Sequence, residues 1–168
     1  MKSSKFILLV LLFCTYKGYS QTYELADEYW AKAKNAEDVE DWESAAKWYE
    51  KSAEAEKKSP SPRLEDLGIE LSNASFYYAK IGNYDKAIIL EIEALKNTEK
   101  ALGKEHSEYG TSLNNLANLY YSKGEYQKAL PLYVEALENA EKSLGKDHST
   151  YGTFLINLAL LYEDLGEY

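Results

Sequence analysis

Asparagine recurs at one fixed spacing along this chain, as Asn73, Asn115 and Asn157. Each amide side chain offers two N–H donors and a carbonyl acceptor, so it can bond to a peptide backbone without reading side chains. Three amides at equal intervals could therefore hold an extended peptide. The same amides could instead bond to an adjacent helix and keep neighbouring units in register. Both interpretations stay open until the elements that carry the asparagines are known.

Residues that could support catalysis do not form a recognisable set. The single cysteine, Cys14, lies in the N-terminal segment. His106 and His148 are the only histidines, and neither has a third metal ligand at a suitable spacing, so we interpret them as loop-packing residues. No phosphate-cradling glycine loop occurs, and no serine and histidine share an orienting acid in a recognisable context. We therefore expect no enzyme, no cofactor and no metal site.

The N-terminus has the layout of a secretory signal peptide. Lys2 and Lys5 precede nine apolar residues, 6–14, and small residues follow as far as Ser20. We predict cleavage after Ser20 and a secreted or periplasmic protein. Nine apolar residues are far fewer than the roughly 20 that cross a bilayer, so an uncleaved anchor is the weaker alternative. Lipidation at Cys14 is disfavoured because bulky Phe13 precedes it.

The charge of the chain is strongly negative. Its formal net charge is −9, and removal of residues 1–20 takes away three lysines and no acid, which gives −12. A phosphate backbone would be repelled, so we expect no nucleic-acid partner. Acidic residues crowd the start of the mature part, where we interpret them as a solvated face: Glu24, Asp27, Glu28, Glu37, Asp38, Glu40 and Asp41.

The sequence repeats itself every 42 residues. Residues 102–126 and 144–168 agree at 17 of 25 positions, and residues 82–101 and 124–143 agree at 11 of 20. A more decayed copy starts near Tyr23. Repeat proteins form open stacks that display a long surface, and such stacks usually bind rather than catalyse.

Each repeat predicts two helices. Leu113, Leu116, Ala117 and Tyr120 have the i, i+3, i+4, i+7 spacing of one helical face, and a second such set follows Gly124. A continuous coiled coil is disfavoured, because each regular glycine would cost about 1 kcal/mol inside a helix. We expect first helices to end at Gly82, Gly124 and Gly166, second helices to end at Gly103 and Gly145, and Ser107 and Ser149 to cap the helices that follow. Small residues should let helices approach closely at Ala87, Ala94, Ala117, Ala129, Ala136 and Ala159.

These residues resemble the tetratricopeptide repeat. Its small eighth, twentieth and twenty-seventh positions match Ala117, Ala129 and Ala136. The 42-residue period and the phrases LNNLANLYYSKGEYQKALPLY and LGKEH resemble the longer subtype of kinesin light chains and bacterial arrays. The resemblance implies an all-α, right-handed α-solenoid of antiparallel helix hairpins with about 3.5 repeats.

The domain organisation follows from these spacings. We expect a signal peptide at 1–20, a degenerate N-terminal repeat at 21–57, a linker at 58–67, and repeats at 68–101, 102–143 and 144–168. The last repeat lacks its second helix, so we expect the front of a longer protein. Its open apolar end would pack on a missing domain or another copy.

The resemblance also implies that first helices line a concave groove. Candidate peptide-binding residues in that groove are Asn73, Phe76, Lys80, Asn114, Asn115, Asn118, Tyr121, Asn157 and Leu160.

The expected function is a non-catalytic scaffold whose groove binds an extended peptide or a segment of a partner protein, with no membrane association after signal cleavage. The alternative is a regulatory or sensor array for a C-terminal catalytic or signalling domain, such as a caspase-like protease or a sensor kinase, as in similar bacterial arrays.

Overall fold

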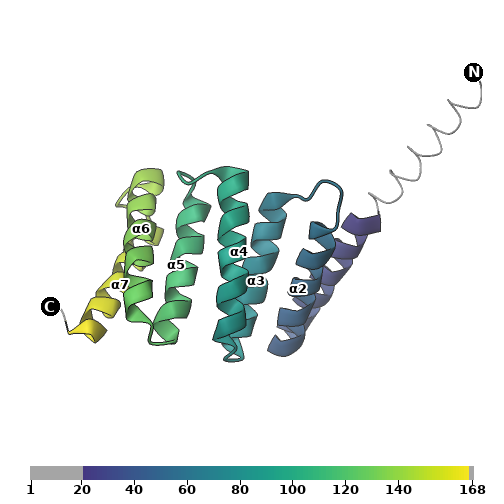
Figure 1. Ribbon diagram of the computed structural model, residues 1–168, viewed down its shortest axis with the longest axis horizontal. Coiled ribbons are helices and arrows are strands. Elements are labelled where there is room, and N and C mark those ends of the chain that lie inside the picture. Colours follow the sequence, from purple (N-terminus) through teal and green to yellow (C-terminus); the bar gives the residue numbers. More distant parts are fainter. Residues whose placement is uncertain (1–20, 167–168) are drawn as a thin grey trace, which may run out of the picture.

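The computed structural model describes residues 21–166, so the predicted signal peptide lies outside the described residues. The described chain is all helical (Figure 1). None of its helices is both long enough and apolar enough to cross a membrane. An N-terminal helix over residues 21–38 is followed by α2 (Trp42–Lys57), α3 (Leu64–Lys80), α4 (Tyr84–Leu102), α5 (Ser107–Ser122), α6 (Tyr126–Leu144) and α7 (Ser149–Leu165).

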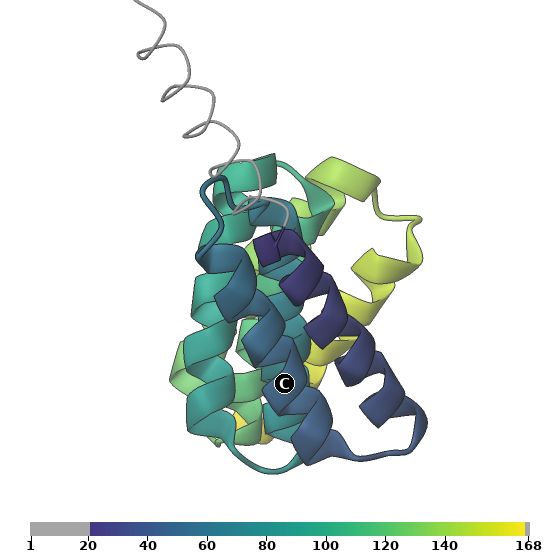
Figure 2. The ribbon, with the colours of Figure 1, turned by 90° about the vertical axis from the view of Figure 1, so that its right-hand side faces the viewer.

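The helices form hairpins that follow one another along the long axis of the molecule (Figures 1 and 2). Helix α3 packs on α2 and α4, α5 packs on α4 and α6, and α7 packs mainly on α6. We call the N-terminal helix, α3, α5 and α7 the first helices, and α2, α4 and α6 the second helices. The predicted all-α solenoid of about 3.5 helix hairpins is confirmed.

Glycine ends the helices where the sequence predicts it. Gly82, Gly124 and Gly166 follow first helices with φ values of +79°, +74° and +73°. Gly103 and Gly145 are the C-caps of α4 and α6, with φ values of +84° and +86°. Residues with a Cβ rarely adopt such angles, so glycine sets the ends of these five helices. The N-terminal helix is instead followed by Glu40 at φ +58°, and the C-cap of α2 is Lys58.

The predicted serine caps are wrong by one residue. Ser107 and Ser149 are the first residues of α5 and α7, and the N-caps are His106 and His148. The Nδ1 atom of His106 accepts a hydrogen bond from the Glu108 backbone N–H at 3.3 Å. His148 accepts one from the Thr150 backbone N–H at 3.2 Å. Both histidines therefore satisfy N–H groups that the helix itself leaves unpaired.

Small residues lie where helices approach most closely. Ala87, Ala94, Ala117, Ala129 and Ala136 are all completely buried. Each allows close contact between neighbouring helices, as the sequence predicts.

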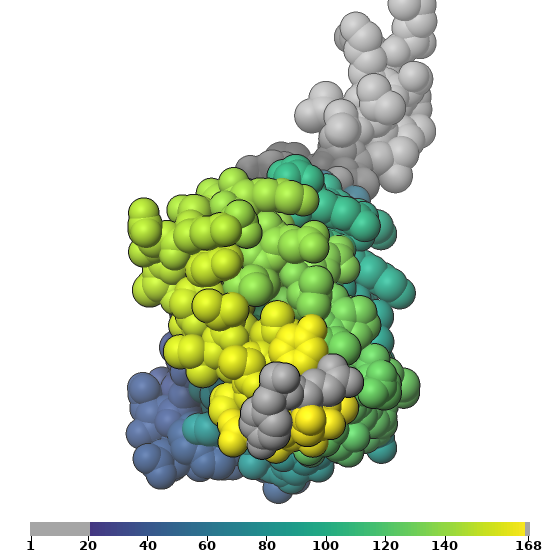
Figure 3. Space-filling view, turned by 90° about the vertical axis from the view of Figure 1, so that its left-hand side faces the viewer, coloured from purple at the N-terminus to yellow at the C-terminus, as the bar shows by residue number. Residues whose placement is uncertain are grey.

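The outer flank of α7 differs from the same flank of α5. Ala159 is exposed, whereas the equivalent Ala117 is buried. Leu155 is 46% exposed, whereas the equivalent Leu113 is 2% exposed because α6 covers it. No helix packs on this flank of α7 within residues 21–166. Figure 3 shows this end of the molecule, where α7 is yellow.

The joint between the first two repeats is shorter than predicted. Helix α3 begins at Leu64, so residues 64–67 of the expected linker form its first turn. The joint itself spans residues 58–63. Arg63 is the N-cap of α3, and its side chain makes no capping hydrogen bond.

Candidate functional site

The first helices share one outward surface, which we call the first-helix face. Its residues recur at the 42-residue spacing, so each position can be compared between repeats. One position is occupied by Trp30, Ser72, Asn114 and Ile156, and a second by Lys34, Phe76, Asn118 and Leu160. The last repeat therefore places apolar residues at both positions where the α5 repeat has asparagines, and the first repeat does so at one of them, Trp30.

Exposed apolar side chains gather on the first helices. Of the ten large apolar residues that are exposed in the described chain, seven lie on first helices and only Ile89 lies on a second helix. On the first-helix face these residues are Trp30 (42% exposed), Ile69 (50%), Phe76 (54%), Ile156 (61%) and Leu160 (47%). Exposed apolar residues that share one surface are typical of a protein-binding site.

Two of the three recurring asparagines bond to the preceding first helix. The Nδ2 atom of Asn115 donates to Oγ of Ser72 on α3 at 3.4 Å. The Nδ2 atom of Asn157 donates to Oδ1 of Asn114 on α5 at 3.0 Å. Both bonds join residues 43 positions apart, so the same contact is made at two successive interfaces. This geometry supports the register role for Asn115 and Asn157.

Asn73 has no such bond, for a reason that lies in the first repeat. The residue 43 positions before Asn73 is Trp30. An indole ring has an N–H donor and no acceptor, so it cannot receive a hydrogen bond from an amide N–H. Asn73 is only partly buried, and its side chain makes no hydrogen bond to another residue in the range 21–166. Its amide is the one of the three that is not committed to holding helices together.

The structure places the other asparagines of the predicted groove close to the core. Asn114 is 6% exposed, and its side-chain oxygen accepts the hydrogen bond from Asn157. The side-chain oxygen of Asn118 accepts a hydrogen bond from the Tyr133 hydroxyl at 2.5 Å. Asn114 is thus largely withdrawn from the surface, and Asn118 is tied to α6.

The remaining predicted residues lie on the surface in three settings, and two of them share one, because Nζ of Lys80 lies 5.5 Å from the ring centroid of Phe76. The ring of Phe76 packs edge-on against Tyr77, with centroids 5.0 Å apart. Lys80 lies over Trp42, with Nζ 3.6 Å from the ring centroid. The Tyr121 hydroxyl donates to Asp164 at 2.5 Å, and this bond raises the pKa of Tyr121 to about 12. Leu160 stays nearly half exposed.

A buried carboxylate lies beneath the first-helix face. Glu91 on α4 is 1% exposed, and both of its carboxylate oxygens are 3.0 Å from the hydroxyl of Ser72. Ser72 also accepts the hydrogen bond from Asn115, so a polar chain runs from the surface to the core. Burial raises the pKa of Glu91 to about 7, although hydrogen bonds from Ser72 and its neighbours oppose that rise.

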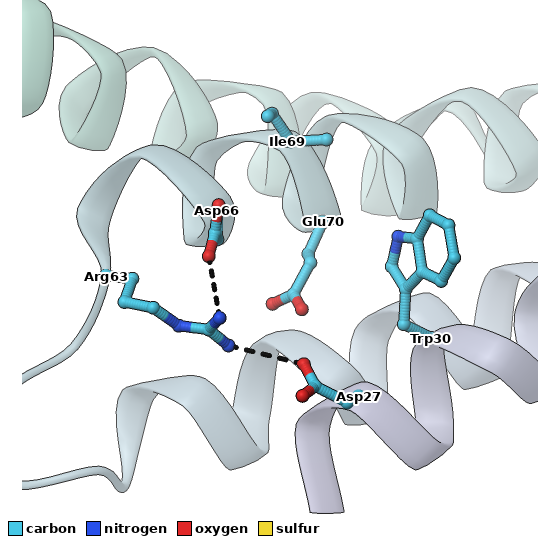
Figure 4. A pocket seen from close by; sticks show the side chains of 6 residues that line it. All are labelled: Asp27, Trp30, Arg63, Asp66, Ile69 and Glu70. Carbon is cyan, nitrogen blue, oxygen red and sulfur yellow. Dashed lines mark hydrogen bonds and ion pairs between the residues drawn. The ribbon is translucent and has the colours of Figure 1, made fainter. Parts of the chain in front are cut away.

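A cavity opens between the N-terminal helix and the start of α3 (Figure 4). Its volume is about 270 Å³. Arg63 lies at one side, where its guanidinium contacts Asp66 at 3.0 Å and Asp27 at 3.5 Å. The six lining residues are Asp27, Trp30, Arg63, Asp66, Ile69 and Glu70.

Glu70 is the most deeply buried residue of this lining. It is 5% exposed, and its Oε1 atom is 2.6 Å from the hydroxyl of Ser52. Its Oε2 atom is buried and has no hydrogen-bond partner among residues 21–166. Burial raises the pKa of Glu70 to about 7, and the Ser52 hydroxyl opposes that rise when it donates to the ionised carboxylate.

The sequence contains a signal for Glu91 that our interpretation missed. Positions 49, 91 and 133 are equivalent, and they carry Tyr49, Glu91 and Tyr133. A glutamate that replaces a buried tyrosine predicts a buried carboxyl group. The cavity was missed because Asp27 was interpreted as part of a solvated acidic face. Within residues 21–166, no three histidine, cysteine or acidic residues are grouped as metal ligands.

A family model described as Tetratricopeptide repeat matches residues 69–142 and 108–168 of the chain. Together these matches cover more than half of the sequence. A search of curated proteins finds no match.

Solved structures with similar folds include kinesin light chain-like proteins. BtubC (BKLC) from P. vanneervenii has a TM-score of 0.73 and 21% identity, over 97% of this chain and 64% of that one. A kinesin light chain candidate from Podosopora anserina with nearly identical TPR-like repeats has a TM-score of 0.73 and 19% identity, over 87% of this chain and 69% of that one. This chain thus spans less than two thirds of the length of BtubC.

The period, the helix hairpins and the family match agree with one another. The chain belongs to the tetratricopeptide repeat family, whose fold is that of a protein–protein interaction scaffold.

Proposed function

We propose that the chain is an exported, non-catalytic scaffold that binds an extended peptide or partner segment on its first-helix face. The observation that carries this proposal is that most exposed large apolar residues of the described chain lie on first helices, and only one lies on a second helix. Burial of such residues against a partner removes apolar surface from water and stabilises the complex.

The polar residues of the same face suit a backbone ligand. Asn73 offers two donors and one acceptor that no neighbouring helix uses, between Ile69 and Phe76 on the same helix. An extended segment could bond to Asn73 through its backbone while its side chains pack against Ile69 and Phe76. The ligand would then be selected mainly by its apolar side chains.

A selection from a displayed library of random peptides tests this proposal. The purified chain should enrich a family of peptides, and the double substitution of Phe76→Ala with Leu160→Ala should weaken their binding about tenfold or more. Ile89→Ala is the matched control, because Ile89 is 66% exposed but lies on the second helix α4. Equal losses in the control and the double variant would contradict a site on the first-helix face.

Export is proposed from the N-terminal sequence alone. The basic start, the nine apolar residues 6–14 and the small residues near Ser20 support a cleaved signal peptide. N-terminal sequencing of the protein recovered from outside the cytoplasm should begin at Gln21. Recovery of an intact Met1 from the cytoplasmic fraction would contradict export.

The exposed flank of α7 supports a second candidate function, in which the array regulates a further catalytic or signalling domain. Leu155 and Ala159 are open there, although their equivalents in α5 are buried. If this flank is a packing surface, then a copy of residues 127–144 appended after Tyr168, which is equivalent to Tyr126, should raise the melting temperature by roughly 5 °C. An unchanged melting temperature would argue against it.

A further inference from the structure

The cavity beside Glu70 opens on the surface proposed to bind a partner segment. Its residues Trp30 and Ile69 belong to the first-helix face, and both are about half exposed. Ile69 is one turn from Asn73 on α3. A segment bound along this face would therefore pass the mouth of the cavity, and one of its side chains could enter.

The lining of the cavity carries an excess of acid. Asp27, Asp66 and Glu70 supply three carboxyl groups, and Arg63 supplies the only positive charge. That charge is already shared, because Arg63 also contacts the carboxylate of Glu56 at 2.9 Å, and Glu56 is completely buried. The cavity is therefore complementary to a cation.

The buried carboxyl group of Glu70 has an unused acceptor. Its Oε2 atom accepts no hydrogen bond from any part of the described chain. Figure 4 shows the carboxyl group between Arg63 and Trp30, directed into the space that the six residues enclose. A buried acceptor without a donor is unfavourable, so a ligand N–H group placed there would be stabilised.

The contacts of the other carboxyl oxygen, Oε1, indicate whether Glu70 is protonated when no ligand is bound. The hydroxyl of Ser52 lies 2.6 Å from Oε1 of Glu70 and 2.8 Å from the Ala26 carbonyl oxygen. A hydroxyl has a single proton, so it can donate to only one of these acceptors. Both contacts are satisfied when Ser52 donates to Ala26 and a protonated Glu70 donates to Ser52.

The apolar walls decide what kind of cation fits. A bare divalent metal would need a shell of oxygen ligands, whereas Trp30, Ile69 and the guanidinium of Arg63 take up much of this lining. A long aliphatic stem could instead pack against Ile69, and a planar cationic group could stack on the indole of Trp30. A volume of about 270 Å³ lies at the small end of ligand sites, so it suits one side chain better than a whole small molecule.

We propose that this cavity is a recognition site for a basic side chain, preferably arginine, of the segment bound on the first-helix face. The proposal rests on the proposed peptide-binding function. The guanidinium group of the ligand would stack on Trp30 and donate to Glu70 and Asp27. Asp27 is available because its contact with Arg63 is long, at 3.5 Å. The five N–H donors of a guanidinium suit several carboxylates better than the three of an ammonium group.

Small probes test the cavity without any knowledge of the natural partner. N-acetyl-arginine methylamide is added to the ¹⁵N-labelled chain, and the shifts of the Trp30 indole and of backbone amides at the start of α3 are followed. Its uncharged analogue, N-acetyl-citrulline methylamide, has nearly the same shape. The arginine probe should bind at least about tenfold more tightly, because charged hydrogen bonds to buried groups are strong. Equal shifts with both probes would overturn the proposal.

Two variants assign the binding to named residues. Glu70→Gln keeps the shape of the side chain and should weaken the arginine probe about tenfold. Glu65→Gln is the matched control, because Glu65 is an exposed acid on the same helix and does not line the cavity. Trp30→Leu changes a partly exposed side chain, so it should fold normally and should also weaken the probe. If neither Glu70→Gln nor Trp30→Leu alters the affinity, the cavity is not the site.

The pH dependence of binding gives a further test. The charged groups around Glu70 are Asp27 on the N-terminal helix, Glu56 on α2, Arg63 in the joint and Asp66 on α3. The pKa of Glu70 is raised to about 7, and a cation favours its ionised form. Affinity for the arginine probe should therefore rise several-fold from pH 6 to pH 8. The rise should disappear in Glu70→Gln, and its persistence there would contradict the role of Glu70.

The two proposals can fail separately. If the peptide selection enriches ligands without a basic residue, and the arginine probe does not bind, then the scaffold binds peptides but this cavity is not a recognition site. If no peptide is enriched, the peptide-binding function itself fails. Enrichment of arginine that Glu70→Gln abolishes, with apolar preferences retained, is the result expected if both are correct.

Discussion

The first joint of this molecule and the two later joints begin a first helix in different ways. The later joints end in His106 and His148, and each ring caps the helix that follows. The first joint ends in Arg63, whose backbone N–H donates to Oε1 of Glu56 at 2.5 Å and whose guanidinium contacts Oε2. An ion pair between the buried Glu56 and the partly exposed Arg63 thus replaces the histidine cap.

The packing of first helices follows the same division. At the two later interfaces a hydrogen bond from an asparagine side chain joins residues 43 positions apart, and at the first interface Trp30 takes the place of the acceptor. The later repeats therefore hold one another in register with side chains that recur. The first repeat has lost that bond, and in its place lies a cavity with an acidic lining. Divergence from the repeat pattern marks the place where a specific site could arise.

Loss of Arg63 should have the largest effect on stability. Arg63→Ala would leave the buried carboxylate of Glu56 without its cation, and we expect the free energy of unfolding to fall by about 3 kcal/mol. The double substitution of Glu56→Gln with Arg63→Met should recover most of that loss, because no buried charge remains. Chemical denaturation measures both effects.

The control for this prediction is Lys57→Ala. Lys57 forms an ion pair with Glu93, and both side chains are more than a third exposed. This ion pair should therefore contribute less than about 1 kcal/mol to the free energy of unfolding. Similar losses in Arg63→Ala and Lys57→Ala would show that burial of Glu56 has no special importance.

The second prediction concerns pH and the core of the second repeat. The pKa of Glu91 is raised from 4.5 to about 7, so the folded chain binds more protons than the unfolded chain between these values. The contribution of Glu91 to stability should therefore fall as the pH rises from about 5 to about 8, by about 2–3 kcal/mol. Glu91→Gln should remove this part of the pH slope and leave the part that is due to Glu70, whose pKa is also raised to about 7, as measured by urea denaturation at several pH values.

Glu138→Gln provides the matched control for Glu91. Glu138 is an exposed acid on the second helix α6, and its substitution should leave the pH slope unchanged. If Glu91→Gln and Glu138→Gln behaved alike, other acids would account for the pH dependence.

The third prediction compares the equivalent asparagines directly. Asn115→Ala and Asn157→Ala each remove a hydrogen bond between first helices, so each should lower the free energy of unfolding by about 1 kcal/mol. Asn73→Ala removes no such bond and should change stability by less than about 0.5 kcal/mol. Affinity for selected peptides should fall mainly in Asn73→Ala. Equal destabilisation by all three variants would remove the distinction between the first interface and the later ones.

The smallest expected effect belongs to the later joints. His148→Ala removes the side-chain acceptor at the start of α7, and we expect a loss of about 0.5–1 kcal/mol. Asp147→Ala in the same joint should be nearly neutral, since Asp147 is exposed. An unchanged melting temperature in His148→Ala would mean that this cap contributes nothing to the joint.

The sequence predicts the architecture well because the features that determine it are periodic. Glycines at a 42-residue spacing set the ends of the helices, and buried alanines set the contacts between them. Each of these signals recurs, so an error in one repeat is corrected by the others. The helix caps were misplaced by one residue because serine and histidine are adjacent and both side chains can accept a hydrogen bond from a backbone N–H.

The candidate site was harder to predict because it depends on departures from the period. Trp30, Glu70 and Glu91 have counterparts of different chemistry in the other repeats, namely Ser72, Ser112 and Tyr133. The hydrogen-bond partners of these side chains lie 18 to 43 positions away in the sequence, so the spacing within one repeat does not reveal them. The asparagine spacing alone could not reveal that two amides are paired and one is not.

The contacts between neighbouring helices also shape how the chain loses order. Since every helix packs mainly on those beside it in the sequence, opening of α7 leaves the contacts among α3, α4 and α5 intact. Backbone amides should thus exchange with deuterium in a gradient, fastest at the bare C-terminal end and slowest in the middle hairpins.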